Sequence, residues 1–467
     1  MENAMTANGT RAESAAGWPS YRTVWRWHFY AGLFCIPFVI WLGITGSIYL
    51  FRPQIEAWLD SPYEHLNIQG QPQSGEAEIV TALKAVPGSN LHYYELPRTT
   101  SSAVRVIVGK GTEEFRVYVH PGTLRVLKVV NEDRRPMTVI FHLHGELLMG
   151  DRGSFIVELA ASWAIVMILT GLYLWWPRDP AGLGGVLYPR FGQGPRIFWR
   201  DLHAVTGIWI SLFVLFLLFT GLPWAKNWGS YLEKIREITH TQSNPDWTIG
   251  QSGEIAARLA LNEPGVPLTA LEHAAHAGHM STNSAIVSYA AIDKMIASVS
   301  PLNLAYPVLI SPPTTLDGHW TAKADPQDRT RGVNLELDPN TGKILKRENF
   351  NQRQWIDRAV EIGVAAHEGQ LFGLPNQLLG LFTGIGVITL SVSSVVLWWR
   401  RRPENVLGAP AAALPKKRHR LSFLAVVVAL GVYLPLLGVS LIAVRLVEAF
   451  VLRRIPLARE WLGLAGA

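Results

Sequence analysis

The stretch RDLHAVTGIWISLFVLFLLFTGLPWA, residues 200–225, decides the fold of this protein. After its opening charges it carries no acidic or basic residue except a histidine, and it exceeds the roughly 20 apolar residues that cross a bilayer as a helix. That histidine, His203, lies at the start of the apolar run. A polar ring at the edge of a lipid-facing helix is costly unless another group holds it. The stretch therefore predicts a transmembrane helix whose histidine has a partner.

The composition of the whole chain agrees with a membrane protein. Of its 467 residues, 49% are hydrophobic and only 17% are charged, and the mean hydropathy is +0.16. The net charge of +6 is modest, and the basic residues cluster beside apolar segments. Such clusters are typical of residues that set membrane orientation, and they argue against a nucleic-acid-binding protein. We expect the lipid bilayer, and no nucleic acid, as a partner.

Five runs are long and apolar enough to cross a bilayer. They are residues 29–51, 153–176, 202–225, 371–399 and 421–444. Lysine and arginine concentrate in the N-terminus (1–28) and in the loops 177–201 and 400–420, so the positive-inside rule places these segments in the cytoplasm. The tail 445–467 is also rich in arginine, although the number of spans places it outside. An interfacial helix in the tail is one explanation that the sequence leaves open.

The long segments 52–152 and 226–370 then lie outside, and each has the pattern of a small α+β domain. In the first, EAEIVTALKAV (76–86) predicts a helix, and residues 103–130 alternate apolar and polar side chains between glycine-containing turns, which predicts strands. In the second, GEIAARLAL (253–261) predicts a helix and VNLELDPNTGKILKRE (333–348) predicts a hairpin. We therefore expect a multi-span α-helical membrane protein with two α+β outside domains.

The two halves of the chain repeat the same plan. His28 precedes Thr45 by 17 residues, and His203 precedes Thr220 by the same 17. HGELLMG (144–150) parallels HEGQLFG (367–373), and each opening histidine, His144 or His367, lies 31 residues before a tryptophan of a Trp-Trp pair. The repeat predicts an internal duplication in which each half contributes one histidine at the inner face and one at the outer face.

Histidines that are paired from two helices at one depth are what a bis-histidine haem b site requires. The 17-residue spacing corresponds to about 26 Å of helix, close to the thickness of the hydrocarbon core. Cys35 is the only cysteine, which excludes thioether-linked haem and cysteine-ligated iron–sulfur clusters. We predict two haem b groups, one between His28 and His203 and one between His144 and His367. Arg22, Arg26 and Arg200 are candidate partners of the inner propionates.

Simpler interpretations remain open for each of these residues. A single interfacial histidine is commonly a hydrogen-bonded residue at a helix end, and the arginines serve first as orientation signals. Glu158 within the second span is either functional or a group near the interface. His273, His276 and His279 share one helical face, which suits either a metal site or a solvated surface.

The motifs that carry these residues resemble a known family. They are WRWHFYAGLFCIPFVIWLGITGSIYLF (25–51), HLHGELLMG (142–150), LTGLYLWWPR (169–178), RDLHAVTGIW (200–209), FTGLPW (219–224), AHEGQLFG (366–373) and LWWRRRP (397–403). As an ordered set they are similar to the PepSY-associated transmembrane family, and within it to the iron-regulated inner-membrane proteins that reduce ferric siderophores. The resemblance covers residues 20–402, and the fifth span is an addition to the four-span pattern.

The resemblance implies PepSY-like outside domains, b-type haem held by His28, His144, His203 and His367, and electron delivery to a periplasmic iron chelate. We therefore predict a ferric-siderophore reductase of the bacterial inner membrane, an oxidoreductase with no catalytic residue of its own. No flavin or nicotinamide domain is visible, so the electron donor is a cytoplasmic reductase or a quinol. His142 and Glu146 are candidates on the substrate side.

Two alternatives remain at this point. One is a di-haem transmembrane cytochrome b that serves another periplasmic acceptor. The other is a haem-free PepSY sensor or a membrane protein that modulates a peptidase.

Overall fold

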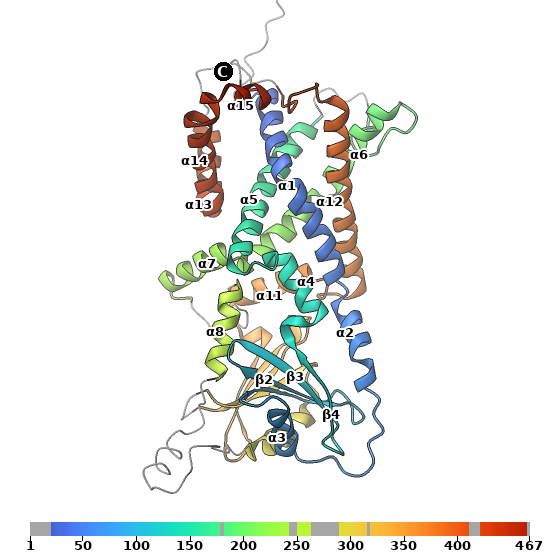
Figure 1. Ribbon diagram of the computed structural model, residues 1–467, viewed down its shortest axis with the longest axis vertical. Coiled ribbons are helices and arrows are strands. Elements are labelled where there is room, and N and C mark those ends of the chain that lie inside the picture. Colours follow the sequence, from blue (N-terminus) through green and yellow to red (C-terminus); the bar gives the residue numbers. More distant parts are fainter. Residues whose placement is uncertain are drawn as a thin grey trace, which may run out of the picture. The chain divides into compact units, whose positions relative to one another are not determined.

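The computed structural model describes residues 20–177, 182–241, 250–262, 289–314, 318–410 and 421–464. Four long helices carry the first four predicted spans, and they are α1 (Tyr21–Tyr49), α5 (Asp151–Trp175), α6 (Pro195–Gly221) and α12 (Leu374–Arg401) (Figure 1). Together with the segment Pro435–Arg454, they are five candidate membrane spans by length and apolar composition. The prediction of a helical membrane protein with five candidate spans is thereby confirmed.

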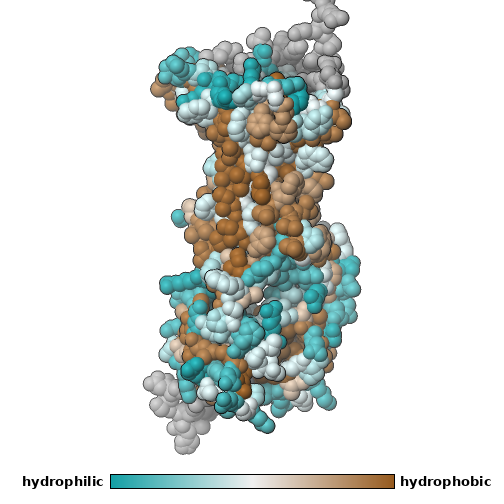
Figure 2. Space-filling model, turned by 90° about the vertical axis from the view of Figure 1, so that its right-hand side faces the viewer, coloured by the Kyte–Doolittle hydropathy of each residue, from teal (hydrophilic) through white to brown (hydrophobic). Residues whose placement is uncertain are grey.

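The chain divides into two compact units. The helical unit comprises Met1–Gly43, Ile156–Phe219 and Thr383–Ala467, and the sheet unit comprises Ile44–Phe155 and Thr220–Phe382. The helical unit exposes large apolar side chains such as Leu212, Val426 and Ile442. The flanks of its helices are brown in Figure 2, whereas the surface over the sheet is mostly teal and white. An apolar surface of this extent on the helices is typical of contact with lipid.

The predicted span 421–444 differs from the structure. The stretch contains α13 (Leu421–Tyr433) and the first part of α14 (Pro435–Phe450), which are separated at Leu434. Leu434 has φ −120° and ψ 81°, outside the helical region. Proline at the next position has no amide hydrogen to continue a helix, but it is well suited to the first turn of a new one.

The two short helices form a hairpin (Figure 1). A β-carbon built on Gly438 would lie 3.1 Å from the carbonyl oxygen of Gly431, so glycine permits the close approach of α14 to α13. Leu407 precedes α13 in the chain, and α15 (Pro456–Trp461) follows α14. The amide of Leu407 donates a hydrogen bond to the carbonyl of Trp461 at 3.0 Å. The segments that enter and leave the hairpin therefore lie together, and the chain does not cross the unit as one straight helix here.

The C-terminal tail returns to the N-terminal end of α1. The guanidinium of Arg26 donates to the carbonyl oxygens of Pro410 at 2.7 Å and Gly463 at 3.2 Å. The hydroxyl of Tyr30 donates to the carbonyl of Leu462 at 2.5 Å. This arrangement gives the arginine-rich tail a physical explanation, because it lies at the same end of the unit as the basic N-terminal end of α1.

We predict that reporters fused after Pro410 and after the C-terminal Ala467 will report the same side of the membrane. The expectation follows from the hairpin, which reverses the chain between these points. Paired green fluorescent protein and alkaline phosphatase fusions measure the side directly. Opposite sides for the two fusions would mean that the region 421–454 crosses the membrane once.

The strands of the sheet unit form one antiparallel sheet. They are β1 (Asn90–Glu95), β2 (Val104–Lys110), β3 (Glu113–Val119), β4 (Val126–Asn131), β5 (Val308–Ser311), β6 (Trp320–Ala324), β7 (Val333–Leu337) and β8 (Ile344–Asn349). Their order in space is β4-β3-β2-β1-β5-β6-β7-β8. The sequence predicted two separate outside domains, whereas β1 pairs with β5 through Tyr94–Ile310 and Glu95–Leu309. This pairing joins the strands of both segments and removes two exposed edges, which would otherwise leave unpaired backbone groups.

Helices from both segments cover this sheet. Helix α3 (Gly75–Ala85) packs against α10 (Ala291–Val299), and Ile79, Ile292 and Met295 are fully buried in a core with the strand residues. Among the described residues of the unit, further α-helices are α2 (Arg52–Asp60), α4 (Pro136–Glu146), α7 (Lys226–Ile238), α8 (Gly250–Asn262) and α11 (Trp355–His367). Helix α4 carries His144 near its C-terminal end and α11 ends at His367, so these two helices carry two of the predicted haem ligands.

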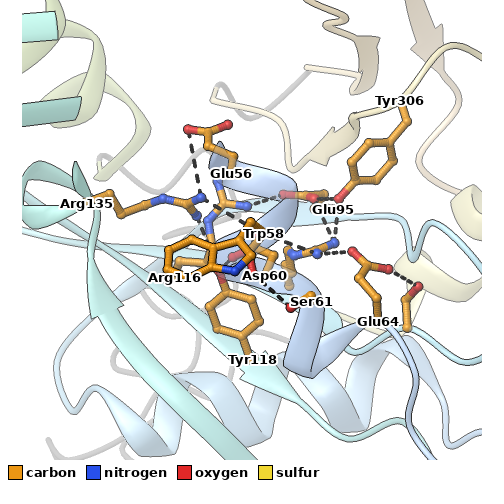
Figure 3. A network of polar contacts seen from close by, with 12 residues as sticks. Glu56, Trp58, Asp60, Ser61, Glu64, Glu95, Arg116, Tyr118, Arg135 and Tyr306 are labelled. Atoms are coloured by element: carbon orange, nitrogen blue, oxygen red, sulfur yellow. Dashed lines mark hydrogen bonds and ion pairs between the residues drawn. The ribbon is translucent and has the colours of Figure 1, made fainter. Parts of the chain in front are cut away.

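A buried ionic network ties α2 and the turn after it to the sheet (Figure 3). Arg105 on β2 contacts Glu64, Glu95 and Asp60, the last two at 3.3 and 3.5 Å. Arg116 on β3 contacts Glu95 at 2.6 Å. Since the hydroxyl of Tyr306, from the second segment, also donates to Glu95, the network reinforces the junction between β1 and β5.

One buried carboxyl group predicts a pH-dependent stability. Burial raises the pKa of Glu78 on α3 to about 7, although the hydroxyl of Tyr94 donates to it at 2.7 Å. Because the folded pKa is raised, this group stabilises the fold at low pH, and the contribution is lost as pH rises from about 4 to about 7. We expect Glu78→Gln to raise stability at pH 8 by up to about 3 kcal/mol and to change little at pH 4. Thermal unfolding at the two pH values tests this, with Glu113→Gln on the exposed end of β3 as control.

Candidate functional site: two histidine pairs

His28 on α1 and His203 on α6 face each other within the helical unit. Their ring centroids are 6.3 Å apart, and the ring planes are inclined by 80°. Nδ1 of His28 lies 3.0 Å from the carbonyl oxygen of Met167 and 3.1 Å from the hydroxyl of Thr170, both on α5. The matching contacts of His203 Nδ1 are made to the carbonyl of Leu390 and the hydroxyl of Ser393 on α12, both at 3.2 Å.

These contacts determine the tautomer of both rings. A carbonyl oxygen only accepts hydrogen bonds, so Nδ1 of His28 and of His203 carries the hydrogen and donates it. Nε2 of each ring then keeps its lone pair. A histidine that ligates a metal characteristically donates its other ring N–H to a backbone carbonyl or similar acceptor, which orients the ring.

His144 on α4 and His367 on α11 form a second pair within the sheet unit. Their centroids are also 6.3 Å apart and their planes are also inclined by 80°. Nδ1 of His144 lies 3.0 Å from the hydroxyl of Thr45 on α1, and Nδ1 of His367 lies 3.0 Å from the hydroxyl of Thr220 on α6. The structure therefore brings together the two histidine pairs that the sequence repeat predicts.

Glycines on the neighbouring helices make room for three of the four rings. A β-carbon built on Gly171 would lie 3.1 Å from Cε1 of His28. The same distance is 3.0 Å for Gly46 and His144, and 3.4 Å for Gly221 and His367. A side chain at Gly46 or Gly171 would displace the neighbouring imidazole ring. Glycine is therefore required at these two positions, because the ring lies so close to the helix backbone.

The equal spacing of the two pairs fits one metal ion between each pair of rings. With each ligating nitrogen about 2 Å from the metal and its ring centre about 1 Å further away, two opposed imidazoles have centres roughly 6 Å apart. The rings of both pairs have this separation. In both pairs, Nδ1 lies within hydrogen-bond distance of a group on a neighbouring helix. The residues present thus fit axial ligation of a haem iron at each pair.

Arg26 and Arg200, two of the arginines predicted for the first pair, have other contacts. Arg22 is exposed at the start of α1. Arg26 donates to backbone carbonyls of the C-terminal tail. Arg200 pairs with the buried Asp201 at 2.7 Å, and Arg190 also bonds to this carboxylate. Their propionate role stays a prediction.

His142 and Glu146 are buried together in α4. Nδ1 of His142 lies 3.1 Å from the carboxylate of Glu146, and this hydrogen bond raises the pKa of His142. His142, Asp133 and Glu254 each offer one potential metal-ligand atom, and these three atoms lie within 4.8 Å of one another. However, Arg258 bonds to both Asp133 and Glu254 at 2.7 Å, so these carboxylates already have a cation.

The sequence did not predict the groups that form hydrogen bonds to Nδ1 of the histidines. Thr45 and Thr220 were used as markers of the repeat, and their constant spacing from His28 and His203 was the available signal. It also missed Arg52 and Arg329, which lie beside aromatic residues near the second pair. Glu158 is 2% exposed within α5, and His273, His276 and His279 lie outside the described residues.

Comparison with known proteins places this sequence in a family. The model of the PepSY-associated TM region matches residues 25–401, which includes all four histidines and the hydroxyl groups that contact them. No curated protein matches the chain. The match covers most of the sequence, and the protein therefore belongs to the PepSY-associated TM family.

Proposed function

We propose that this protein is a di-haem b reductase of the bacterial inner membrane that carries electrons to ferric siderophores in the periplasm. The observation that carries the proposal is the occurrence of two histidine pairs with the same 6.3 Å separation and 80° inclination. A bound haem would supply one-electron chemistry, with its potential set by the axial ligands, hydrogen bonding and burial.

The residues of the chain orient and insulate the proposed ligands. The carbonyls of Met167 and Leu390 hold the hydrogen on Nδ1 of His28 and His203, which leaves the lone pair of Nε2 as the atom that would bind the haem iron. Thr45 and Thr220 contact the corresponding nitrogens of His144 and His367. Mutation of such outer-shell partners typically costs about 10–100-fold in metal affinity or activity.

The substrate requires one electron and no bond cleavage in the chelator. Hard oxygen ligands hold Fe(III) strongly, and the reduction to Fe(II) weakens this binding because divalent iron is low in the order of affinities. No nucleophile or paired-carboxylate site is needed for this step. The buried pair of His142 and Glu146, which precedes and follows His144 by two residues in α4, remains our candidate on the substrate side.

The proposed orientation places the basic end of α1 in the cytoplasm and the sheet unit in the periplasm. The hairpin of α13 and α14 supports this orientation, since it returns the arginines of the tail to the end of α1 that carries Arg26. We also propose that the chain is an internal duplication, because each half contributes one histidine to each pair and four strands to the sheet. The donor is a cytoplasmic reductase or a membrane quinol.

An absorption spectrum of the purified full-length protein, followed by a reduction assay, tests the function. We expect a Soret band that shifts on addition of dithionite, and reoxidation by a ferric hydroxamate or catecholate chelate with release of Fe(II) to a ferrous-specific chromophore. A colourless protein would support the haem-free sensor or peptidase-modulating alternative. A haem protein that no ferric chelate reoxidises would support a cytochrome b with another acceptor.

A further inference from the structure

We propose that Arg52 and Arg329 form a carboxylate clamp at the His144–His367 pair, which takes the two propionate groups of the haem b held there. This proposal rests on the proposed function and extends it to residues that sequence reasoning had not singled out. The clamp contains one arginine from each half of the chain, matched to the two acidic groups of the ligand.

The two arginines stack on aromatic residues that occupy equivalent positions in the two halves of the chain. Tyr49 lies four residues after Thr45, and Trp224, at the end of the short helix η3 (Leu222–Trp224), lies four residues after Thr220. Cζ of Arg52 lies 5.6 Å from the centroid of the Tyr49 ring. Cζ of Arg329, in the short helix η5 (Arg329–Arg331), lies 5.3 Å from the centroid of Trp224. Each threonine that orients a ligand is thus followed by an aromatic ring that carries a guanidinium.

Phe141 brings both aromatic–arginine units to the same place. Its ring centroid is 5.9 Å from that of Tyr49 and 6.0 Å from that of Trp224. Phe141 precedes His144 by three residues in α4, so the two side chains are neighbours on one face of this helix. The contacts therefore place Arg52 and Arg329 around the end of α4 that carries the ligand.

The buried Nε–H group of Arg329 has no hydrogen-bond acceptor among the described residues, and a carboxylate of the ligand would supply one. A buried donor without a partner is costly, and a planar guanidinium suits two-point binding of a carboxylate. Arg52 donates from Nε to Glu56 at 3.2 Å and from Nη1 to the Tyr49 hydroxyl at 2.8 Å, and its Nη2 makes no hydrogen bond to a described residue.

A structural role for these arginines is the competing explanation. Both guanidinium groups act electrostatically on Glu368, next to His367, and Arg329 acts on Asp325. If they only balanced these carboxylates, their loss would lower the unfolding temperature without a specific effect on one haem. A redox potential separates the two roles, because a cation beside a propionate favours the reduced haem.

The test is a potentiometric titration of the purified full-length protein, followed by its visible spectrum. We expect R329Q and R52Q each to lower the equilibrium constant for reduction of one haem about tenfold, which is a shift of about −59 mV. The affected haem should be the one that is absent from His367→Ala. R329K should recover most of the shift, since it keeps the charge and loses only the planar fork.

The matched control is R98Q, which removes an arginine stacked on another aromatic ring, 4.9 Å from the centroid of Tyr306. It should leave both potentials unchanged. Unchanged potentials in both R329Q and R52Q, or equal shifts of the two haems, would overturn the clamp while leaving the proposed function intact. A wild-type protein without haem would instead overturn the proposed function.

Discussion

Replacement of His367 by alanine is expected to remove one of the two proposed haems and leave the other. His144 would lose the opposing ring that now lies 6.3 Å away, while the His28–His203 pair keeps its own partners on α5 and α12. His28→Ala should remove the other haem for the same reason. The pyridine haemochromogen assay should find half of the wild-type haem in each variant. Loss of a group that contacts a metal ligand typically costs about 10–100-fold in activity. Because His367→Ala removes a ligand itself, the rate of ferric-chelate reduction should fall by more than this.

A histidine outside the pairs provides the control for this experiment. His65 is exposed and follows the short turn after α2. His65→Ala should keep the full haem content and the wild-type unfolding temperature. Full haem content in both His28→Ala and His367→Ala would contradict the ligand assignment.

The largest effect on stability is expected from Arg105→Met. The Arg105 side chain is 2% exposed and pairs with Glu64, Glu95 and Asp60. Its removal leaves buried carboxylates without a cation, which typically costs about 3–5 kcal/mol. Since Glu95 also accepts from Tyr306, the loss should loosen the junction of β1 and β5 as well. Thermal or denaturant unfolding of the purified protein measures the change.

Lys346→Met is the matched control, because it removes a charge from an exposed ion pair. Lys346 and Glu336 are 63% and 41% exposed, and their 3.0 Å contact joins β7 and β8 at the surface. Pairs of this kind contribute up to about 1 kcal/mol. An Arg105→Met protein no less stable than Lys346→Met would show that the buried network contributes little to stability.

The four long helices and the pairing of the histidines follow from local features of the sequence. A continuous apolar run predicts a membrane helix wherever it occurs, because the backbone satisfies its own hydrogen bonds and the side chains need only lipid. The repeat then predicts which histidines share a site. Both inferences depend on residue type and spacing alone, and the pairing required the matched spacing of all four histidines in the two halves.

The tertiary structure decided the features that depend on contacts between distant segments. The pairing of β1 with β5 joins residues more than 200 positions apart, and no local pattern distinguishes it from two separate sheets. The hairpin of α13 and α14 has the hydropathy of a single span, and only Leu434, Pro435 and the approach of Gly438 to Gly431 reverse the chain. The positions of Arg52 and Arg329 beside the second histidine pair are likewise a product of packing. The hydrophobicity of a segment is set by its own residues. The direction of the chain after α13, the pairing of β1 with β5 and the positions of the arginines arise only when the folded chain brings distant groups together.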